Sequence, residues 1–516
     1  MGWERKRGKL AEFNRLLRGD EGTSFVLQIG NPDFLSGVEY VITLDADTVF
    51  PLDSGHELVG TLAHPLNRAE FGTDTTRREG ATPGSEQVVA GYTVLQPRTE
   101  VEPTAVTQSR FTRIFAGDAG LDLYTRAVSD VYQDFFDEGI YIGKGIYDVD
   151  GFERSLKGRV PENALLSHDL FEGIHGRAAL VTDVVLFEDY PPDYLSYAHR
   201  RHRWVRGDWQ IMPWLFPRVP HAGEGTIPNC LTTLDRWKIL DNLRRSLRSP
   251  ALLALLVAGW LVLPGSPLAW TVAAVLSSGL PVVTGAITEA ARRFQGGAHV
   301  GGGPRSGTEA VRWLLSLAFL PYETILMIDA IVTTLVRLLI SHKRLLQWTT
   351  AAHTVRLFGR RSKIGLLWRQ MGGGPAIAVM VLVALSLVRP AVLILAGPFL
   401  LAWLVSPQIA GWISRPLEED DQELSSQERR RLRRITRRTW LYFERFVGPE
   451  DHWLPPDHFQ ENPRGVVARR TSPTNIGFML LSTLLAYDMG YIGLMELTLR
   501  TSDAFDSMDR MERYRG

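Results

Sequence analysis

YVITLDADTVF, residues 40–50, indicates both the class of the fold and the place of a site. Its β-branched run at residues 41–43 predicts a buried strand, which ends in an Asp-Ala-Asp triplet. Asp45 and Asp47 are therefore expected at the carboxyl edge of a sheet, where open α/β folds bind their ligands. Two carboxylates so close together suit a Mg²⁺ or Mn²⁺ ion that bridges nucleotide phosphates. Alone the triplet is weak evidence, because an Asp pair at a strand end often forms a turn or a helix cap.

A second acidic motif lies downstream in LLSHDLFEG, residues 165–173. Asp169 follows a short apolar run there, which makes its carboxylate a candidate general base. The structural alternative is that Asp169 caps a helix that begins at Leu170. Glu172 comes one helical turn later, so it either shares the site or completes a capping box.

A third motif, HRRHRWVRGDWQ at residues 199–210, combines arginines with an indole. Arg200, Arg203 and Trp204 stand in an R-x-x-R-W arrangement. Guanidinium groups suit a diphosphate because they stay charged and donate hydrogen bonds in a fork. The alternative is a basic amphipathic helix at a membrane surface, and the two interpretations are compatible.

The order of the three motifs resembles that of the processive, membrane-bound, inverting glycosyltransferases. In that family a DxD motif is followed by an acidic base motif and then by Q-x-x-R-W, where this chain has Arg200 in place of the glutamine. Longer segments resemble one branch, the cyclic β-1,2-glucan synthases. These segments are ERKRGKLAEFNRLLRG (4–19), GYTVLQPR (91–98), FFDEGIYIGKGIYDVDGF (135–152), LLSHDLFEG (165–173) and RTSPTNIG (470–477).

The resemblance implies a GT-A-like α/β fold and a role for each motif residue. Asp47 is expected to be the direct metal ligand, with Asp45 nearer the ribose or behind the metal ligands, and Asp169 to be the catalytic base. The resemblance adds five donor-binding residues, three of them in a basic turn near the start of the chain: Lys6, Gly8, Lys9, Arg200 and Arg203.

The acceptor is expected beside the base. Trp204 offers a flat apolar face for a sugar ring, and Glu172 lies one turn from Asp169. In the Gly143-Lys144-Gly145 turn the glycines let the backbone approach a ligand, and Lys144 is able to meet a phosphate or a sugar hydroxyl. A lone G-x-G is more often only a turn.

Composition narrows the function classes. The 57 basic and 57 acidic residues give a net charge of zero, so no overall field attracts nucleic acid. The single cysteine, Cys230, excludes a disulfide framework and a cysteine-based zinc site.

The hydropathy pattern predicts four consecutive regions. Residues 1–245 alternate short strands (FVLQIG, YVITLD, YTVLQP and AALVTDVVLFED) with helices at 54–69 and 107–136, and residues 72–88 are expected to form a loop. A membrane region at 249–413 and a charged linker helix at 414–440 follow. Residues 441–516 resemble the opening of a glycoamylase-like, all-α domain. By the resemblance the first nucleotide-binding strand and the later domains are missing, so we expect an internal fragment that is inactive alone.

Four nearly charge-free segments, 250–264, 268–288, 375–388 and 391–413, each approach the length that crosses a bilayer. Residues 312–340 are also apolar but contain Pro321, Glu323 and Asp329. Four basic residues lie between 289 and 313 and seven between 341 and 374. The short turn between 264 and 268 carries none, and the turn between 388 and 391 carries one, Arg389. The positive-inside rule therefore places both long loops in the cytoplasm, and 312–340 is expected to be interfacial or packed on the catalytic domain.

These features predict an inverting glucosyltransferase of the bacterial inner membrane, with a cytoplasmic catalytic domain that polymerises glucose from UDP-glucose into cyclic β-1,2-glucan. Its expected partners are the donor, the growing glucan, the lipid bilayer and the missing domains, but not nucleic acid. Two alternatives stay open: a synthase of another β-glycan such as cellulose, hyaluronan or chitin, and a non-catalytic membrane scaffold. Arg200 and RTSPTNIG argue against another β-glycan.

Overall fold

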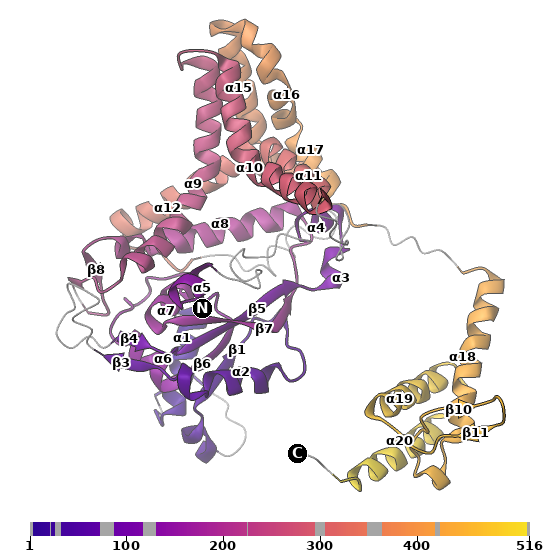
Figure 1. The fold of residues 1–516 in the computed structure, drawn as a ribbon. Coiled ribbons are helices and arrows are strands. Elements are labelled where there is room, and N and C mark those ends of the chain that lie inside the picture. Colours follow the sequence, from indigo (N-terminus) through magenta and orange to yellow (C-terminus); the bar gives the residue numbers. More distant parts are fainter. Residues whose placement is uncertain are drawn as a thin grey trace. The chain divides into compact units, whose positions relative to one another are not determined.

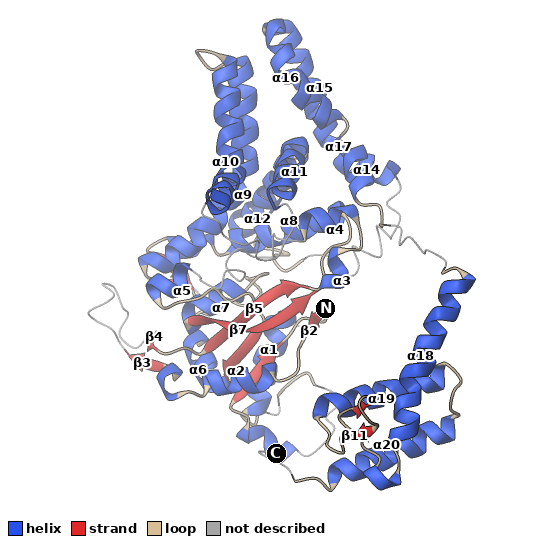
Figure 2. Ribbon diagram, turned by 45° about the vertical axis from the view of Figure 1, so that its right-hand side comes forward, coloured by secondary structure: helices blue, strands red, loops and turns tan. Residues whose placement is uncertain are grey.

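The structure is a computed structural model that describes residues 4–20, 22–25, 32–72, 87–116, 131–223, 225–294, 305–347, 364–417 and 424–512. The chain divides into two compact units, residues 1–417 and 418–516, and each is described by itself. The first unit joins the predicted transferase domain to the predicted membrane region. The fold is mixed α/β (Figure 2).

A mixed sheet of the order β1-β6-β5-β7-β2 forms the centre of the first unit (Figure 1). β5 and β7 are parallel, whereas β6 is antiparallel to both β1 and β5. The carboxyl ends of β1, β5 and β7 therefore meet the start of β6 at one edge of the sheet. The strands are β1 (Tyr40–Thr43), β2 (Thr48–Val49), β5 (Val94–Val101), β6 (Gly145–Asp148) and β7 (Ala178–Glu188).

Three of the four predicted strands are present as β1, β5 and β7. The fourth, FVLQIG, lies almost wholly outside the described residues. Strand β6 was not predicted. The ends of the predicted loop at 72–88 belong instead to two short paired strands, β3 (Glu70–Gly72) and β4 (Gln87–Ala90), and its residues 73–86 are not described.

Helices cover both faces of the sheet, and the alternation of side chains along each strand explains why both faces are apolar. On one face α1 (Arg5–Leu17) and α6 (Val149–Leu156) share a core with Val94, Tyr147 and Ala178. On the other face α2 (Ser54–Leu62) packs on the adjacent residue of each strand, namely Leu95, Ile146 and Ala179.

Two predicted helices differ in their extent. The helix expected at 54–69 ends at Leu62, before Pro65, whose ring cannot continue a helix. The helix expected at 107–136 is seen as α4 (Arg110–Phe115) and α5 (Val131–Phe136), with residues 117–130 not described. The remaining short elements before α8 are η1 (Pro32–Gly37), η2 (Pro65–Asn67), α3 (Pro103–Val106) and α7 (Asp169–Gly176).

Two long helices lie between the sheet and the upright helices of Figures 1 and 2: α8 (Tyr194–Gln210) and α12 (Leu320–Val336). Polar contacts join them, because Arg201 lies 3.1 Å from Glu323 and His202 lies 2.8 Å from Asp329. The two acidic residues that interrupt the apolar segment 312–340 therefore face α8. This contact supports the predicted packing of that segment on the catalytic domain.

The upright helices form two hairpins that share one apolar core. Its largest members, Trp260 and Trp403, are fully buried, while many aliphatic side chains on the outer faces are exposed. The helices are α9 (Thr233–Leu261), α10 (Pro267–Phe294), α15 (Gly373–Val388) and α16 (Leu393–Leu404), flanked by α11 (Arg305–Ala318), α14 (Ile364–Met371) and α17 (Ser406–Ile413). The predicted segment 250–264 is thus the second half of a helix that starts much earlier, at Thr233.

Length and composition select a different set of candidate membrane spans from the predicted one. Among the described residues, Leu320–Ser341 is long and apolar enough to cross a bilayer, with a mean hydropathy of 1.9. Two bent pairs, Ile364–Val388 and Pro390–Ile413, would bring the number to three, with bends of 58° and 51°. The predicted crossings 375–388 and 391–413 fall within these bent pairs, whereas 250–264 and 268–288 are not among the candidates in the described part of the chain. The four-crossing arrangement therefore stays a prediction.

The second unit is a small helical body. Its core contains Trp440, Phe443, Met479, Ala486 and Ala504. Its elements are α18 (Ser426–Phe446), β10 (Phe459–Gln460), β11 (Val466–Val467), α19 (Pro473–Asp488) and α20 (Leu494–Asp509). The predicted boundary between linker and domain, at 440, falls inside α18, because the second half of this helix packs on α19.

Candidate active site

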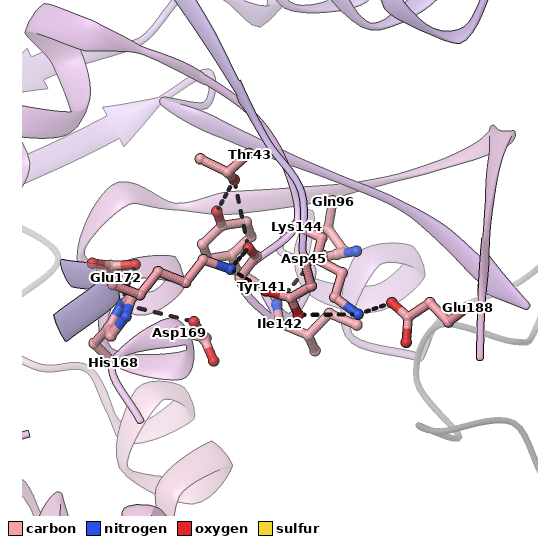
Figure 3. A network of polar contacts seen from close by, with 12 residues as sticks. Thr43, Asp45, Gln96, Tyr141, Ile142, Lys144, His168, Asp169, Glu172 and Glu188 are labelled. Carbon is pink, nitrogen blue, oxygen red and sulfur yellow. Dashed lines mark hydrogen bonds and ion pairs between the residues drawn. The ribbon is translucent and has the colours of Figure 1, made fainter. Parts of the chain in front are cut away.

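A cluster of ion pairs marks the carboxyl edge of the sheet, directly after β1 (Figure 3). The ammonium group of Lys6 on α1 donates to Oδ1 of Asp45 at 2.8 Å and to the carbonyl of Gly143 at 2.8 Å. Lys144, just before β6, lies 3.3 Å from Oδ2 of Asp45 and pairs with Glu188 at the end of β7. Each carboxylate oxygen of Asp45 therefore contacts a lysine.

The charges in this cluster change one another's pKa. Burial alone would raise the pKa of Asp45, but Lys6 and Lys144 outweigh that effect and lower the pKa. Burial lowers the pKa of Lys144, and the nearby carboxylates of Asp45 and Asp47 offset part of the change. Asp47 itself is exposed. Of the two DxD carboxylates, Asp47 is thus the better suited to bind a cation from solution.

Two glycines allow the turn before β6 to approach its neighbours. Gly143 has φ +88°, and a Cβ there would lie 2.3 Å from Oδ1 of Asp169. Gly145 has φ +143°, and a Cβ there would lie 2.0 Å from the carbonyl oxygen of Leu95. The glycines of the Gly-Lys-Gly turn therefore bring the backbone against Asp169 and against β5. Their positive φ angles are ones that residues with a side chain rarely adopt.

Asp169 is the first residue of α7, and His168 occupies the N-cap position without a side-chain capping bond. The structure therefore does not support the alternative in which Asp169 caps the helix, nor a capping box with Glu172. His168 instead makes ionic contacts: its Nδ1 lies 2.8 Å from Glu172 and 3.7 Å from Asp169. Figure 3 shows this group and the Asp45 cluster on either side of Tyr141.

His168 is the residue that the sequence reasoning missed. Its ring and the carboxylates of Asp169 and Glu172 offer ligand atoms within 4.8 Å of one another, so this group is a second candidate cation site beside Asp45 and Asp47. The signal was present in the sequence, because residues four apart on a helix lie on the same face and His168 precedes Glu172 by four.

The arginines of the third motif interact electrostatically with the carboxylates of Asp45, Asp47 and Asp169. Burial lowers the pKa of Arg200, while Asp45 and Asp47 act against that change. Burial and Arg200 lower the pKa of Arg203, while Asp169, Asp45 and Asp47 act against it. The Arg200 guanidinium lies over the Trp204 ring, 4.7 Å from its centroid. One face of the indole is therefore covered, so a sugar would have to stack on the other.

Close packing fixes α8 against the segment that carries Asp169. A Cβ at Gly207 would lie 2.4 Å from that of Ser167. Gln210, which the sequence left without a role, accepts a hydrogen bond from the Leu166 amide at 2.6 Å and donates to the Leu345 carbonyl at 3.0 Å. These contacts tie α8 to the segment that carries Asp169 and to the segment that follows α12.

The start of the chain differs from the predicted basic turn. Lys6, Gly8 and Lys9 lie on α1, because Phe13 and Leu17 pack this segment on the sheet as a helix. Lys6 reaches Asp45, whereas Gly8 is buried within α1 and Lys9 is exposed. The predicted contacts of Gly8 and Lys9 with the nucleotide stay untested.

No family profile matches the chain. Over 531 aligned positions, which include the whole chain, it is 44% identical to the cyclic beta-(1,2)-glucan synthase NdvB of Rhizobium meliloti (strain 1021). The resemblance to the cyclic β-1,2-glucan synthases is confirmed. The chain spans 18% of the length of NdvB, so it corresponds to one part of that synthase.

The buried His168 gives a prediction for stability against pH. Burial alone would lower its pKa, but Glu172 and Asp169 outweigh that effect and raise the pKa. The stabilisation that the protonated His168 ring gives the folded protein is therefore complete below the ordinary histidine pKa of about 6.5. It is lost as pH rises through the higher pKa of the folded protein. We expect His168→Gln to destabilise the protein by about 3 kcal/mol near pH 6, as for a broken buried pair, and by much less near pH 9.

Thermal melts at the two pH values test this, with His56→Gln on the exposed side of α2 as the control. An equal loss of stability at both pH values would show that the protonated ring does not stabilise the fold.

Proposed function

We propose that this chain carries the glucosyl-transfer site of a membrane-bound synthase that polymerises glucose from UDP-glucose into β-1,2-glucan with inversion at C1. One observation carries the proposal. Asp45 and Asp47, the candidate base Asp169 and the arginines of α8 converge at one edge of the sheet, in a chain similar to NdvB throughout. Transfer of a sugar from a nucleotide needs these groups: a carboxylate base and cationic partners for the leaving diphosphate.

The donor binds with its diphosphate between the DxD edge and α8 in this proposal. Arg200 and Arg203 donate hydrogen bonds to phosphate oxygens, and Lys144, whose pKa Arg200 helps to lower, adds a further positive charge nearby. The exposed oxygens of Asp47 are hard ligands that fit Mg²⁺ or Mn²⁺, while Asp45, held by two lysines, orients the turn behind it. A cation bound there would neutralise the departing diphosphate.

The acceptor hydroxyl approaches from the side of α7. Asp169 removes its proton as the oxygen attacks C1 of the glucosyl group, and UDP leaves from the opposite face, which inverts the anomeric centre. The Asp169 side chain is 28% exposed, so it is accessible to an acceptor, and Gly143 packs against it. His168 and Glu172 hold the base in place from the buried side.

The experiment is an incorporation assay on membranes that contain the full-length parent protein. Labelled UDP-glucose should yield a polymer, and linkage analysis should find β-1,2 bonds. A polymer with another linkage would instead establish a synthase of another β-glycan. No incorporation by well-folded protein would favour the scaffold alternative.

Membrane topology gives a prediction that follows from the basic loops. In a Cys230→Ser background, a cysteine at Ser266, in the α9–α10 turn, should react with an impermeant maleimide in intact cells. A cysteine at Lys343 should react only after the membrane is opened, because α12 lies on the cytoplasmic face with its acidic residues against α8. Labelling of Lys343→Cys in intact cells would show that Leu320–Ser341 crosses the bilayer.

A further inference from the structure

The first half of α18 has a composition that the packing of its unit explains only at Arg437, which pairs with Glu444 and lies over the Tyr491 ring. Residues 426–438 read SQERRRLRRITRR, with seven arginines and one glutamate. The side chains that α18 buries, Trp440 and Phe443, belong to its second half. Residues 424–435 are all exposed. The arginines therefore present a concentrated positive charge to the surroundings of this unit.

The arrangement of residues around the helix is amphipathic. Arg430, Arg434 and Arg438 follow one another at helical spacing along one side. Leu432 and Ile435 lie on the other side, and they are 49% and 53% exposed. A basic face beside an exposed aliphatic strip is typical of helices that lie in the plane of a membrane surface.

The position of α18 along the chain points to the same surface. Residues 414–425 alone separate it from α17, the end of the candidate span Pro390–Ile413. A polybasic segment directly after a hydrophobic segment is attracted by the negative potential of anionic lipids. A neutral glucan offers no charge that would require seven guanidinium groups.

We propose that the first half of α18 lies on the membrane surface and binds the phosphate groups of anionic phospholipids. Its arginines pair with headgroup phosphates in a fork geometry, and Leu432 and Ile435 insert at the level of the upper acyl chains. The proposal rests on the membrane embedding proposed above. It would hold the second unit beside the bilayer.

The test uses the full chain in lipid nanodiscs, in a Cys230→Ser background, with a fluorophore on Thr439→Cys at the edge of the aliphatic strip. Spin-labelled lipids should quench this fluorophore in discs that contain phosphatidylglycerol. Quenching should be weak in discs of phosphatidylcholine alone and should fall at high salt. A fluorophore on Ser502→Cys, exposed on α20, serves as the control and should not be quenched.

Charge variants separate electrostatic binding from mere proximity. The triple change Arg430→Gln, Arg434→Gln and Arg438→Gln should shift the bound–free equilibrium of α18 by about 100-fold, whereas the matched triple change to lysine should largely retain binding. Equal quenching in both kinds of disc, or an unchanged glutamine variant, would overturn the proposal. Failure of the chain to enter discs would instead contradict the membrane embedding itself.

Discussion

Asp169→Asn should lower the turnover of the full-length parent synthase by about 100-fold or more, the usual scale for the loss of a general base. Asparagine keeps the shape of the side chain and its packing against Gly143, but it cannot accept the proton of the acceptor hydroxyl. The affinity for UDP should change little, because the donor phosphates are expected to contact the DxD edge and α8. Initial rates with saturating UDP-glucose, together with calorimetry of UDP binding, provide the measurement.

Glu57→Gln, on the exposed side of α2, is the matched control for the loss of a carboxylate. Near-normal turnover of Asp169→Asn with a lowered melting temperature would contradict the base assignment. It would return Asp169 to a purely structural role at the start of α7.

Asp47→Asn should weaken metal-dependent binding of UDP. The substitution replaces a charged oxygen ligand of a hard cation with a neutral amide. We expect the affinity for UDP in the presence of the metal to fall at least about 10-fold. Mutation of residues that only hydrogen-bond to the direct ligands of a metal already lowers metal affinity by that factor. Calorimetric titration of UDP with and without Mn²⁺ measures the effect.

Asp45→Asn is the informative comparison for Asp47→Asn. Because Lys6 and Lys144 hold the two oxygens of Asp45, its loss should disturb the turn at Gly143 and lower the melting temperature more than Asp47→Asn does. Unchanged, metal-dependent UDP binding by Asp47→Asn would remove Asp47 from the site.

The strands that carry the site were predictable because each contains a short run of apolar or β-branched residues. β1 is half-buried up to the buried Thr43, and β5 and β7 each begin with buried residues. The rule that ligands gather at carboxyl ends placed Asp45 and Asp47 at the right edge. β6 was not predictable, because it has only four residues, begins with Gly145 and contains a single β-branched residue, Ile146. The order of strands, with β6 antiparallel between β1 and β5, depends on long-range pairing that periodicity does not encode.

The ion pairs of the site could not be predicted from the sequence for a similar reason. Lys6 and Asp45 are 39 residues apart and Lys144 and Glu188 are 44 apart, so only the fold brings them together. The pair of His168 and Glu172 is local and could have been predicted from its spacing. Hydropathy marked the apolar half of α9 but not its polar first half, which is helical because a capping box at Thr232 and Asp235 starts it.

The most direct test of the proposed site is a structure of the full-length parent with UDP and Mn²⁺ bound. The proposal predicts a metal peak about 2 Å from the Asp47 carboxylate, with the diphosphate between that metal and Arg200 and Arg203. It also predicts that Asp169 faces the side from which an acceptor would approach. A metal held instead by His168, Asp169 and Glu172, or a nucleotide bound away from the carboxyl edge of the sheet, would contradict it.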